Sequence, residues 1–456
     1  MAGHFLQERR AGVLLHPSSL PSGRLDGDAE RWLDLLADAG ISVWQVLPLG
    51  VTHEDHSPYQ CLSAFAMNPA LFGETTGAHI DAADFESWKA SQQHWLVDFA
   101  SFMIIREQQG SAPWYAWPDA LRLRDPDTLA AIRSRHVTEI AAVCEQQYLY
   151  HRRWAQIRDY ARERGILLFG DMPIFVAYDS ADIWANPDLF LLNDDLSPEY
   201  VAGVPPDYFS ETGQRWGNPH FDWDQMQLDG FAWWMQRFTH HFDIFDIVRI
   251  DHFRGLEAVW MIPESSPTAV DGFWQKTPGD ALLATLRDRI GELPLVAEDL
   301  GIITPEVVAL RKEYDLPGMA VLQFGFDAFD DNPHKPKNIH NDTVVYTGTH
   351  DNNTTLGWYR SLDADTQQHV HTVLGMSAGQ DVVDTMIEIA LNTPACLSVL
   401  PMQDLLHLDE EARMNRPGTV ENNWKWRFDW EQVSPTLVEK TRERLLASGR
   451  TGVSHD

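Results

Sequence analysis

Short apolar runs alternate along the chain with longer segments whose apolar residues recur at helical spacing. The runs that predict β-strands occupy residues 11–22, 42–50, 165–176, 245–253, 293–301, 319–327, 343–351 and 396–404. The segments that predict helices occupy residues 26–39, 145–164, 226–240, 279–291, 304–314 and 363–392, and Gly40, Thr304 and Pro305 are typical helix-end residues. Eight strands with intervening helices predict an α/β protein of the (β/α)8, or TIM-barrel, class.

The chain of 456 residues is longer than such a barrel commonly needs, which is about 250 residues. We therefore expect residues 1–456 to form a single catalytic barrel with inserted subdomains and no separate C-terminal β-domain. One insertion, residues 51–145, follows the second strand and is mostly helical. The other, residues 191–223, follows the third strand, and its Gly, Pro and aromatic content predicts a substrate-binding loop over the site.

Carboxylates stand at the ends of the strand-like runs. The C-terminal ends of barrel strands form the active-site face, and alternate side chains of a strand point the same way, so Arg249 and Asp251 in "IVRID" share a face. Any one of these acids could simply cap the next helix. Together with Arg249, His252 and His350, however, they indicate an active site. The strand-end acids are Asp171, Asp251, Glu298, Asp351 and Asp404.

Paired carboxylates without a metal-ligand pattern suit chemistry at a glycosidic bond. One carboxylate attacks the anomeric carbon, and the other protonates the leaving oxygen and then deprotonates the acceptor. Asp251 must then stay charged, which Arg249 supports, whereas Glu298 must stay protonated near neutral pH. The separation of the two groups, which decides between retention and inversion, is not contained in a sequence.

Composition limits which binding partners are plausible. The net charge of -32 repels phosphate backbones and anionic lipids, so we expect neither nucleic acid nor membrane as a partner. The chain has 18 tryptophans, more than we expect for its length. Many should lie in the core, but those in loops, such as Trp114, Trp117, Trp216 and Trp424, could stack on sugar rings. Three separated cysteines and the absence of an apolar N-terminal leader favour the cytoplasm.

The chain resembles the amylomaltases, or 4-α-glucanotransferases, of glycoside hydrolase family 77 in the α-amylase clan. The resemblance runs from near residue 12 to near residue 427, almost the whole chain. Small departures are Cys61, where a serine is expected, and "MPIF" after Asp171, where many clan members have a histidine. The matching stretches are "LLHPSSLPS", "WQVLPLG", "SPYQCLSAFAMNP", "GDMPIFV", "ETGQRWGNPHFDW", "VRIDHFRGL", "VAEDLGIITPEV", "GTHDNNTTLGWY" and "NRPGTVENNWKWR".

The resemblance implies roles for the strand-end residues. Asp251 is the expected nucleophile, Glu298 the general acid/base, and Asp351 the residue that stabilises the distorted, oxocarbenium-like sugar. Arg249 is expected to keep the nucleophile ionised and His350 to bind sugar hydroxyls. Asp171 belongs to the clan's strand-three motif.

Further substrate-binding residues are implied in the loops. Tyr59 resembles a residue that stacks on sugar near the cleavage point. The remaining candidates are Ser57, Gln214, Trp216, Asn218 and Asp207, with Asp404, Asn415 and Trp424 after strand eight left open between substrate contact and packing.

The implied activity is transfer of α-1,4-glucan segments from donor to acceptor sugars through a covalent β-glucosyl-enzyme, with no cofactor and no metal ion. Two alternatives stay open. A hydrolase of the same clan would use the same residues with water as acceptor. A non-catalytic glycan-binding protein would be expected to have lost members of the acid set, yet Asp251, Glu298 and Asp351 are all present.

Overall fold

Eight parallel strands form the centre of the computed structural model, which describes residues 8–73, 79–206 and 210–450. Their order is β10-β11-β12-β1-β2-β3-β6-β9. The backbone N–H of Ala297 on β9 donates to Pro317 O, just before β10, at 2.8 Å and closes the ring. The strands are β1 Arg10–Leu14, β2 Val43–Gln45, β3 Leu167–Pro173, β6 Ile247–Asp251, β9 Leu295–Ala297, β10 Gly318–Val321, β11 Thr343–Tyr346 and β12 Leu397–Pro401. Each falls within a predicted run or within one residue of it, so the predicted barrel is confirmed.

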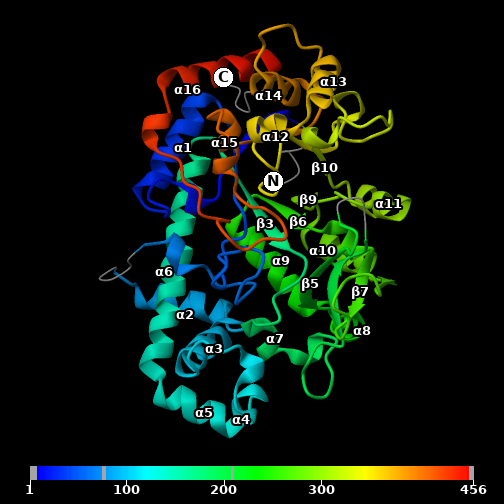
Figure 1. Cartoon of the computed structure of the whole chain (residues 1–456). Helices are drawn as coiled ribbons and strands as arrows, with labels where there is room; N and C mark the ends of the chain where they lie inside the picture. Colours follow the sequence, from blue (N-terminus) through cyan, green and yellow to red (C-terminus); the bar gives the residue numbers. More distant parts are fainter. Residues whose placement is uncertain (1–7, 74–78, 207–209, 451–456) are drawn as a thin grey trace.

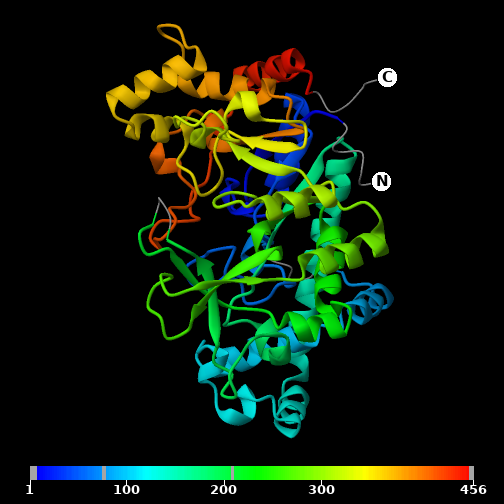
Figure 2. The ribbon, with the colours of Figure 1, turned by 90° about the vertical axis from the view of Figure 1, so that its right-hand side faces the viewer.

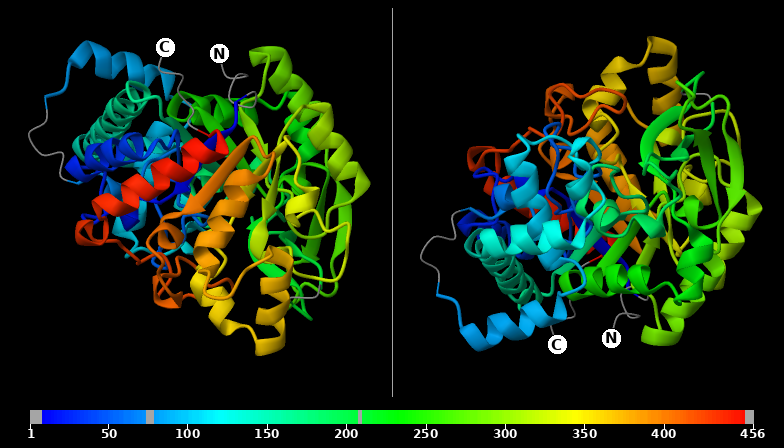
Figure 3. Two further views of the ribbon diagram at one scale, coloured as in Figure 1. Left: turned by 90° about the horizontal axis from the view of Figure 1, so that it is seen from above. Right: turned by 90° about the horizontal axis from the view of Figure 1, so that it is seen from below.

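Helices surround the barrel. In Figure 1 the long α6 runs along one side, and α16 lies beside α1 and α14 near one end of the molecule, an arrangement that Figure 3 shows from above. The helices are α1 Gly27–Ala39, α2 Ala82–Ser91, α3 Leu96–Gln108, α4 Asp119–Arg122, α5 Pro126–Arg135, α6 Val137–Arg162, α7 Ala181–Ala185, α8 Trp223–Leu228, α9 Ala232–Ile244, α10 Gly279–Ile290, α11 Pro305–Glu313, α12 Thr355–Ser361, α13 Ala364–Leu374, α14 Val382–Asn392, α15 Met402–Leu405 and α16 Pro435–Ser448. No helix in the described ranges is both long and apolar enough to cross a membrane.

Helix ends follow local chemistry. The Asp26 side chain accepts the N–H of Asp28 at the start of α1, and Gly40 ends that helix in the left-handed region, as predicted. Residues 363–392, predicted as one helix, form α13 and α14, because Gly375 ends the first at φ 64° and Asp381 caps the second. Residues 226–240 likewise divide between α8 and α9.

Residues 51–145 are irregular up to η2 (Pro69–Leu71) and mostly helical from α2 onward. Helices α2, α3 and α5 pack on α6, and Figures 1 and 2 place them at the end of the molecule opposite α14 and α16. Trp114 and Trp117 belong to the core of this region, with 0% and 3% exposure. The suggestion that these two tryptophans could stack on sugar is therefore wrong, because their rings are covered by protein.

A second sheet covers part of residues 191–223, which were expected to be loop. β4 (Tyr200–Val204) and β5 (Gln214–Pro219) join β7 (Ala258–Pro263) and β8 (Phe273–Lys276) in an antiparallel sheet of order β5-β4-β7-β8. This sheet lies beside the barrel in Figure 2. Strands β4, β5 and β8 escaped prediction because β4 and β5 are interrupted by glycine and every residue of β8 is exposed, whereas β7 is an apolar run that had a readable signal.

The interior of the barrel explains which side chains reach its mouth. Every strand of the barrel contributes one or two apolar side chains to the same inner cluster, among them Phe169, Ile247 and Val296 on β3, β6 and β9. Two residues further along each of these strands comes a charged residue, in turn Asp171, Arg249 and Glu298. Because the side-chain period of a strand is two, the charged groups project inward above the apolar layer.

Candidate active site

A buried arginine organises one side of the barrel mouth. Arg249 Nη1 donates to Asp171 Oδ1 at 2.8 Å and Oδ2 at 2.7 Å, and its Nη2 lies 2.9 Å from Asp251 Oδ1. Tyr59 donates its phenolic hydrogen to Asp171 Oδ2 at 2.7 Å. The register pairs Asp171 with Arg249 across β3 and β6, so neighbouring strands set this geometry directly.

The charges of this group are fixed by their proximity. Burial on its own would lower the pKa of Arg249, but Asp171 and Asp251 raise it well above the usual value. Arg249 therefore stays cationic. The side chain of Asp251 keeps 29% of its surface exposed, so it offers an ion-paired carboxylate to the barrel mouth.

Glu298, directly after β9, has the opposite character. Burial raises its pKa to about 8, an effect that Arg249 and two backbone N–H groups reduce and Asp251 increases. Those N–H groups belong to His252, 2.6 Å from Oε2, and Leu300, 3.0 Å from Oε1. His252 has a positive φ of 53°, an uncommon conformation for a non-glycine residue, immediately after Asp251. Glu298 is thus a carboxylic acid that keeps its proton at neutral pH.

The other side of the mouth lies beyond β11. Asp351 Oδ1 accepts a hydrogen bond from Asn415 Nδ2 at 2.7 Å and lies 3.4 Å from His350 Nε2. Tyr59 stacks on His350 with 5.1 Å between ring centroids and 16° between planes. Trp424 is 6.2 Å from Tyr59 and 5.9 Å from His350. Tyr59 therefore contacts both sides, through its hydroxyl and through its ring.

The loop candidates fall into two groups. Trp216 meets the ring of His252 edge-on at 4.9 Å and donates its Nε1 hydrogen to Gln214 Oε1 at 3.1 Å, which places both near the residue after Asp251. Asn218 is buried and donates to Val176 O at 2.9 Å, so it fastens β5 to the chain that follows β3.

Two further candidates have a different status. The Ser57 hydroxyl accepts the backbone N–H of Tyr59 at 3.4 Å within the local turn. Asp207 lies outside the described residues.

The three candidates left open after strand eight separate clearly. Asn415 and Trp424 join the site through the contacts above. Asp404 is 1% exposed, and its carboxylate accepts from Thr347 Oγ1 at 2.6 Å and from the N–H and Oγ1 of Thr355, each at 2.7 Å. Asp404 therefore joins the chain after β11 to the start of α12, and both of its oxygens are occupied by these donors.

Sequence reasoning missed two residues of the site. Arg413 donates from Nη2 to Asp351 O at 2.6 Å, and no motif or strand pattern marks it. His16, two residues after β1, also lies near His350. Burial, and then the charge of His350, lowers the pKa of His16 to about 3, so its ring is neutral.

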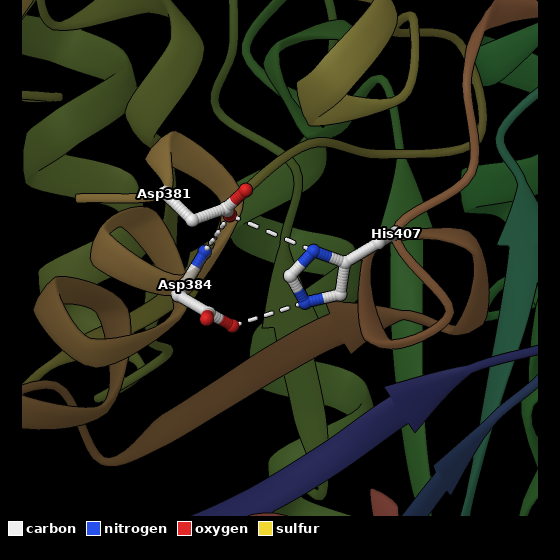
Figure 4. Close-up of side chains that lie close together, drawn as sticks. All are labelled: Asp381, Asp384 and His407. Atoms are coloured by element: carbon white, nitrogen blue, oxygen red, sulfur yellow. Dashed lines mark hydrogen bonds and ion pairs between the residues drawn. The ribbon is translucent and has the colours of Figure 1, made fainter. Parts of the chain in front are cut away.

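One cluster elsewhere has spacing that could suit a metal ion. Asp381, Asp384 and His407 lie close together in Figure 4, with the imidazole between the two carboxylates at 3.5 Å and 3.0 Å. Lys440 and Arg444, each 2.7 Å from Asp384, already balance this charge. The cluster is an ion-pair network that joins α14 to α16 and to the chain after α15.

A parallel barrel with an arginine-paired carboxylate beside a protonated carboxylic acid defines the class of barrel enzymes that act on glycosidic bonds. The family model described as 4-alpha-glucanotransferase, glycoside hydrolase family 77, matches residues 14–76 and 72–432. The chain belongs to this family.

Individual relatives agree with the family model. The 4-alpha-glucanotransferase of Thermus thermophilus is 42% identical over 97% of this chain and 99% of its own, and that of Synechocystis is 41% identical over 95% and 96%. A solved amylomaltase from Streptococcus agalactiae, in complex with acarbose, superposes with a TM-score of 0.92 at 31% identity, covering 97% of this chain and 100% of its own.

Proposed function

We propose that this 4-alpha-glucanotransferase works by a retaining double displacement, in which it moves segments of α-1,4-glucans to the 4-hydroxyl of an acceptor glucan or glucose. Two observations support the activity. Relatives described as 4-alpha-glucanotransferases match nearly the whole chain, and the S. agalactiae amylomaltase is described in complex with acarbose. The observation that carries the mechanism is the pair formed by Asp251, held by Arg249, and Glu298, whose pKa is raised to about 8.

The first half-reaction uses both acids. Asp251 attacks the anomeric carbon and forms a carbon–oxygen bond as the bond to the leaving 4-oxygen breaks, and Glu298 gives its proton to that oxygen. The product is a covalent β-glucosyl-enzyme. Asp351 stabilises the positive charge that develops at the sugar between these two states.

The second half-reaction returns the enzyme to its starting state. Glu298, now a carboxylate, takes the proton of the acceptor 4-hydroxyl, whose oxygen attacks the anomeric carbon as the bond to Asp251 breaks. The new α-1,4 bond and the protonated Glu298 leave no net change in protons.

Substrate binding is the second part of the proposal. We propose that Tyr59, His350 and Trp424 line the donor sugar at the cleavage point. Trp216 and Gln214, beside His252, would meet the acceptor, with residues 51–145 and 191–223 as insertions that complete the site. Binding of an acceptor sugar at Trp216 would favour transfer over hydrolysis, because an occupied acceptor site leaves little room for water.

Product analysis with maltotriose tests the activity. Transfer produces glucose and a ladder of longer maltooligosaccharides while the number of reducing ends stays nearly constant. A clan hydrolase would instead raise the number of reducing ends without making longer chains. A mechanism-based fluorosugar, which forms the intermediate but releases it slowly, tests the route: a peptide containing Asp251 should carry the sugar.

We also propose that the enzyme acts in the cytoplasm on free glucans. Its cysteines are unpaired among the described residues, although relatives from potato and rice are described as chloroplastic or amyloplastic. Fractionation of the source cells, with activity assayed in each fraction, checks this.

A further inference from the structure

Asp351 is held at both ends by residues that come more than sixty positions later in the chain. Its carboxylate accepts from Asn415 Nδ2 at 2.7 Å, and its backbone carbonyl accepts from Arg413 Nη2 at 2.6 Å. Arg413 also donates from Nε to Asn415 O at 2.7 Å, and Asn415 N–H donates to His350 O at 3.1 Å. Two side chains and one backbone group thus form a bracket around residues 350 and 351.

We propose that Asn415 is a positioning residue for transfer, which acts by holding the Asp351 carboxylate in its working orientation, and that Arg413 supports it through the backbone. The inference rests on the role of Asp351 in the proposed mechanism and adds residues that the strand-end set lacks.

Asp351 needs such support because its other contacts are long, including the 3.4 Å between its Oδ1 and His350 Nε2. It follows β11 in a turn, and its side chain is 48% exposed. Its backbone N–H donates to Thr349 Oγ1 at a long 3.3 Å. An unsupported carboxylate there would rotate among several orientations, at an entropic cost whenever the sugar required one of them.

The chemistry of an amide suits this task. Asn415 Nδ2 occupies Oδ1 and leaves Oδ2 free to accept from sugar hydroxyls. An amide donor carries no charge, so it orients the carboxylate without neutralising the negative charge that faces the developing cation.

The segment that carries the bracket, residues 413–424, is itself braced. Arg416 N–H donates to Asn423 Oδ1 at 3.0 Å, and Asn423 Nδ2 donates to Thr419 O at 2.8 Å. The N–H of Trp424 donates to Met414 O at 2.8 Å, which closes the segment between the bracket and the ring beside His350. The segment is therefore rigid enough to hold the Asn415 side chain in a fixed position against Asp351.

A double-mutant cycle tests the proposal. Asn415→Ala should lower kcat for maltotriose disproportionation by about 10- to 100-fold, the scale of a catalytic group displaced by a fraction of its own size, with a smaller change in KM. Asp351→Asn should lower kcat further. The double variant should be no slower than Asp351→Asn alone, because Asn415 has nothing left to position.

Controls separate positioning from other effects. Glu421→Gln, an exposed change in the same segment, should retain wild-type kcat, and all variants should melt within a few degrees of wild type. Asn415→Ser, which keeps a short donor, should recover part of the lost kcat.

Each alternative has its own outcome. Multiplying effects in the double variant would mean that Asn415 acts on the sugar directly, and wild-type kcat in Asn415→Ala would overturn the proposal outright. Wild-type activity in Asp351→Asn would instead overturn the assignment of Asp351 in the proposed mechanism.

Discussion

The two sides of the barrel mouth are built in different ways. On the side of β3, β6 and β9, the charged groups sit on neighbouring strands, and Arg249, itself buried, joins the buried Asp171 and the half-buried Asp251 at hydrogen-bonding distance. On the side of β11, Asp351 sits in an exposed turn and depends on Asn415 and Arg413 from a distant segment. Tyr59 connects the two, with its hydroxyl on Asp171 and its ring on His350.

This difference matches the tasks that we assign to the two sides. A nucleophile and an acid need fixed separation and opposite protonation states, which adjacent strands and burial supply. Asp351, which we assign to the distorted sugar, lies in an exposed turn after the end of β11. Its carboxylate is therefore positioned by the side chains of Asn415 and Arg413 and not by strand pairing.

The strand-borne side should fail completely when its nucleophile is removed. Asp251→Asn keeps the shape of the side chain and its contact with Arg249 but cannot form the glucosyl bond, so we expect kcat for maltotriose to fall on the order of 10³-fold or more. The check is glucose release with time, together with a melting curve that shows a folded variant. Near wild-type turnover would refute the assignment of Asp251.

Glu298 should show a loss that depends on the leaving group. Glu298→Gln removes the acid, and we expect about 10²- to 10⁴-fold slower reaction of maltotriose. α-Glucosyl fluoride, whose leaving group needs no proton, should still form the covalent intermediate at a rate much nearer to wild type. Equal losses on both donors would contradict the assignment of the acid.

The raised pKa of Glu298 also has consequences for pH. It rises from 4.5 to about 8 on folding, so the folded protein keeps a proton that the unfolded chain releases above pH 4.5. Stability contributed by this group is therefore complete below pH 4.5 and is lost as the pH rises through about 8. Wild type should lose stability relative to Glu298→Gln over this window, and activity should decline near its upper end.

Strand periodicity and the rule that barrel sites lie at strand ends predicted candidates on both sides of the mouth, because both signals are local in the chain. They singled out Asp171, Asp251 and Glu298 on the strand-borne side and Asp351 on the other. Asp404 carries the same signal yet is buried against Thr347 and Thr355, and only the fold shows that those hydroxyls meet it. A strand-end carboxylate therefore marks a position, and its neighbours decide its use.

On the loop-borne side the sequence supplied Asp351, His350 and Tyr59 as candidates, but not the contacts that hold Asp351 in place. Arg413 and Asn415 meet Asp351 across more than sixty residues, and no pattern of spacing encodes such a contact. The break between α13 and α14 had a readable signal in Gly375 and Asp381. The second sheet had a weaker signal: β7 is an apolar run, "AVWMIP", but β4 and β5 contain glycine and every residue of β8 is exposed.

Arg249→Lys tests the strand-borne side with a smaller expected loss of activity than Asp251→Asn. A lysine has a single ammonium group and cannot serve Asp171 and Asp251 together as the guanidinium does, so one carboxylate loses its partner. We expect kcat/KM for maltotriose to fall by about 10- to 100-fold. Arg416→Lys, an exposed arginine in the 413–424 segment, is the matched control and should behave as wild type.

Asp404→Asn should have the smallest effect on kcat, and its main effect should be a lower free energy of unfolding. The amide keeps one acceptor oxygen but places a donor where Thr347 and Thr355 now donate, and we expect a loss of about 1–3 kcal/mol in the free energy of unfolding. Because Asp404 is buried and both its oxygens already accept hydrogen bonds from Thr347 and Thr355, kcat of the folded variant should change by only a few-fold. Urea unfolding and initial rates measured on the same preparation separate the two quantities. A fall in kcat as large as that of Arg249→Lys, with stability unchanged, would place Asp404 among the residues that act on the sugar and would extend the strand-borne side to β12.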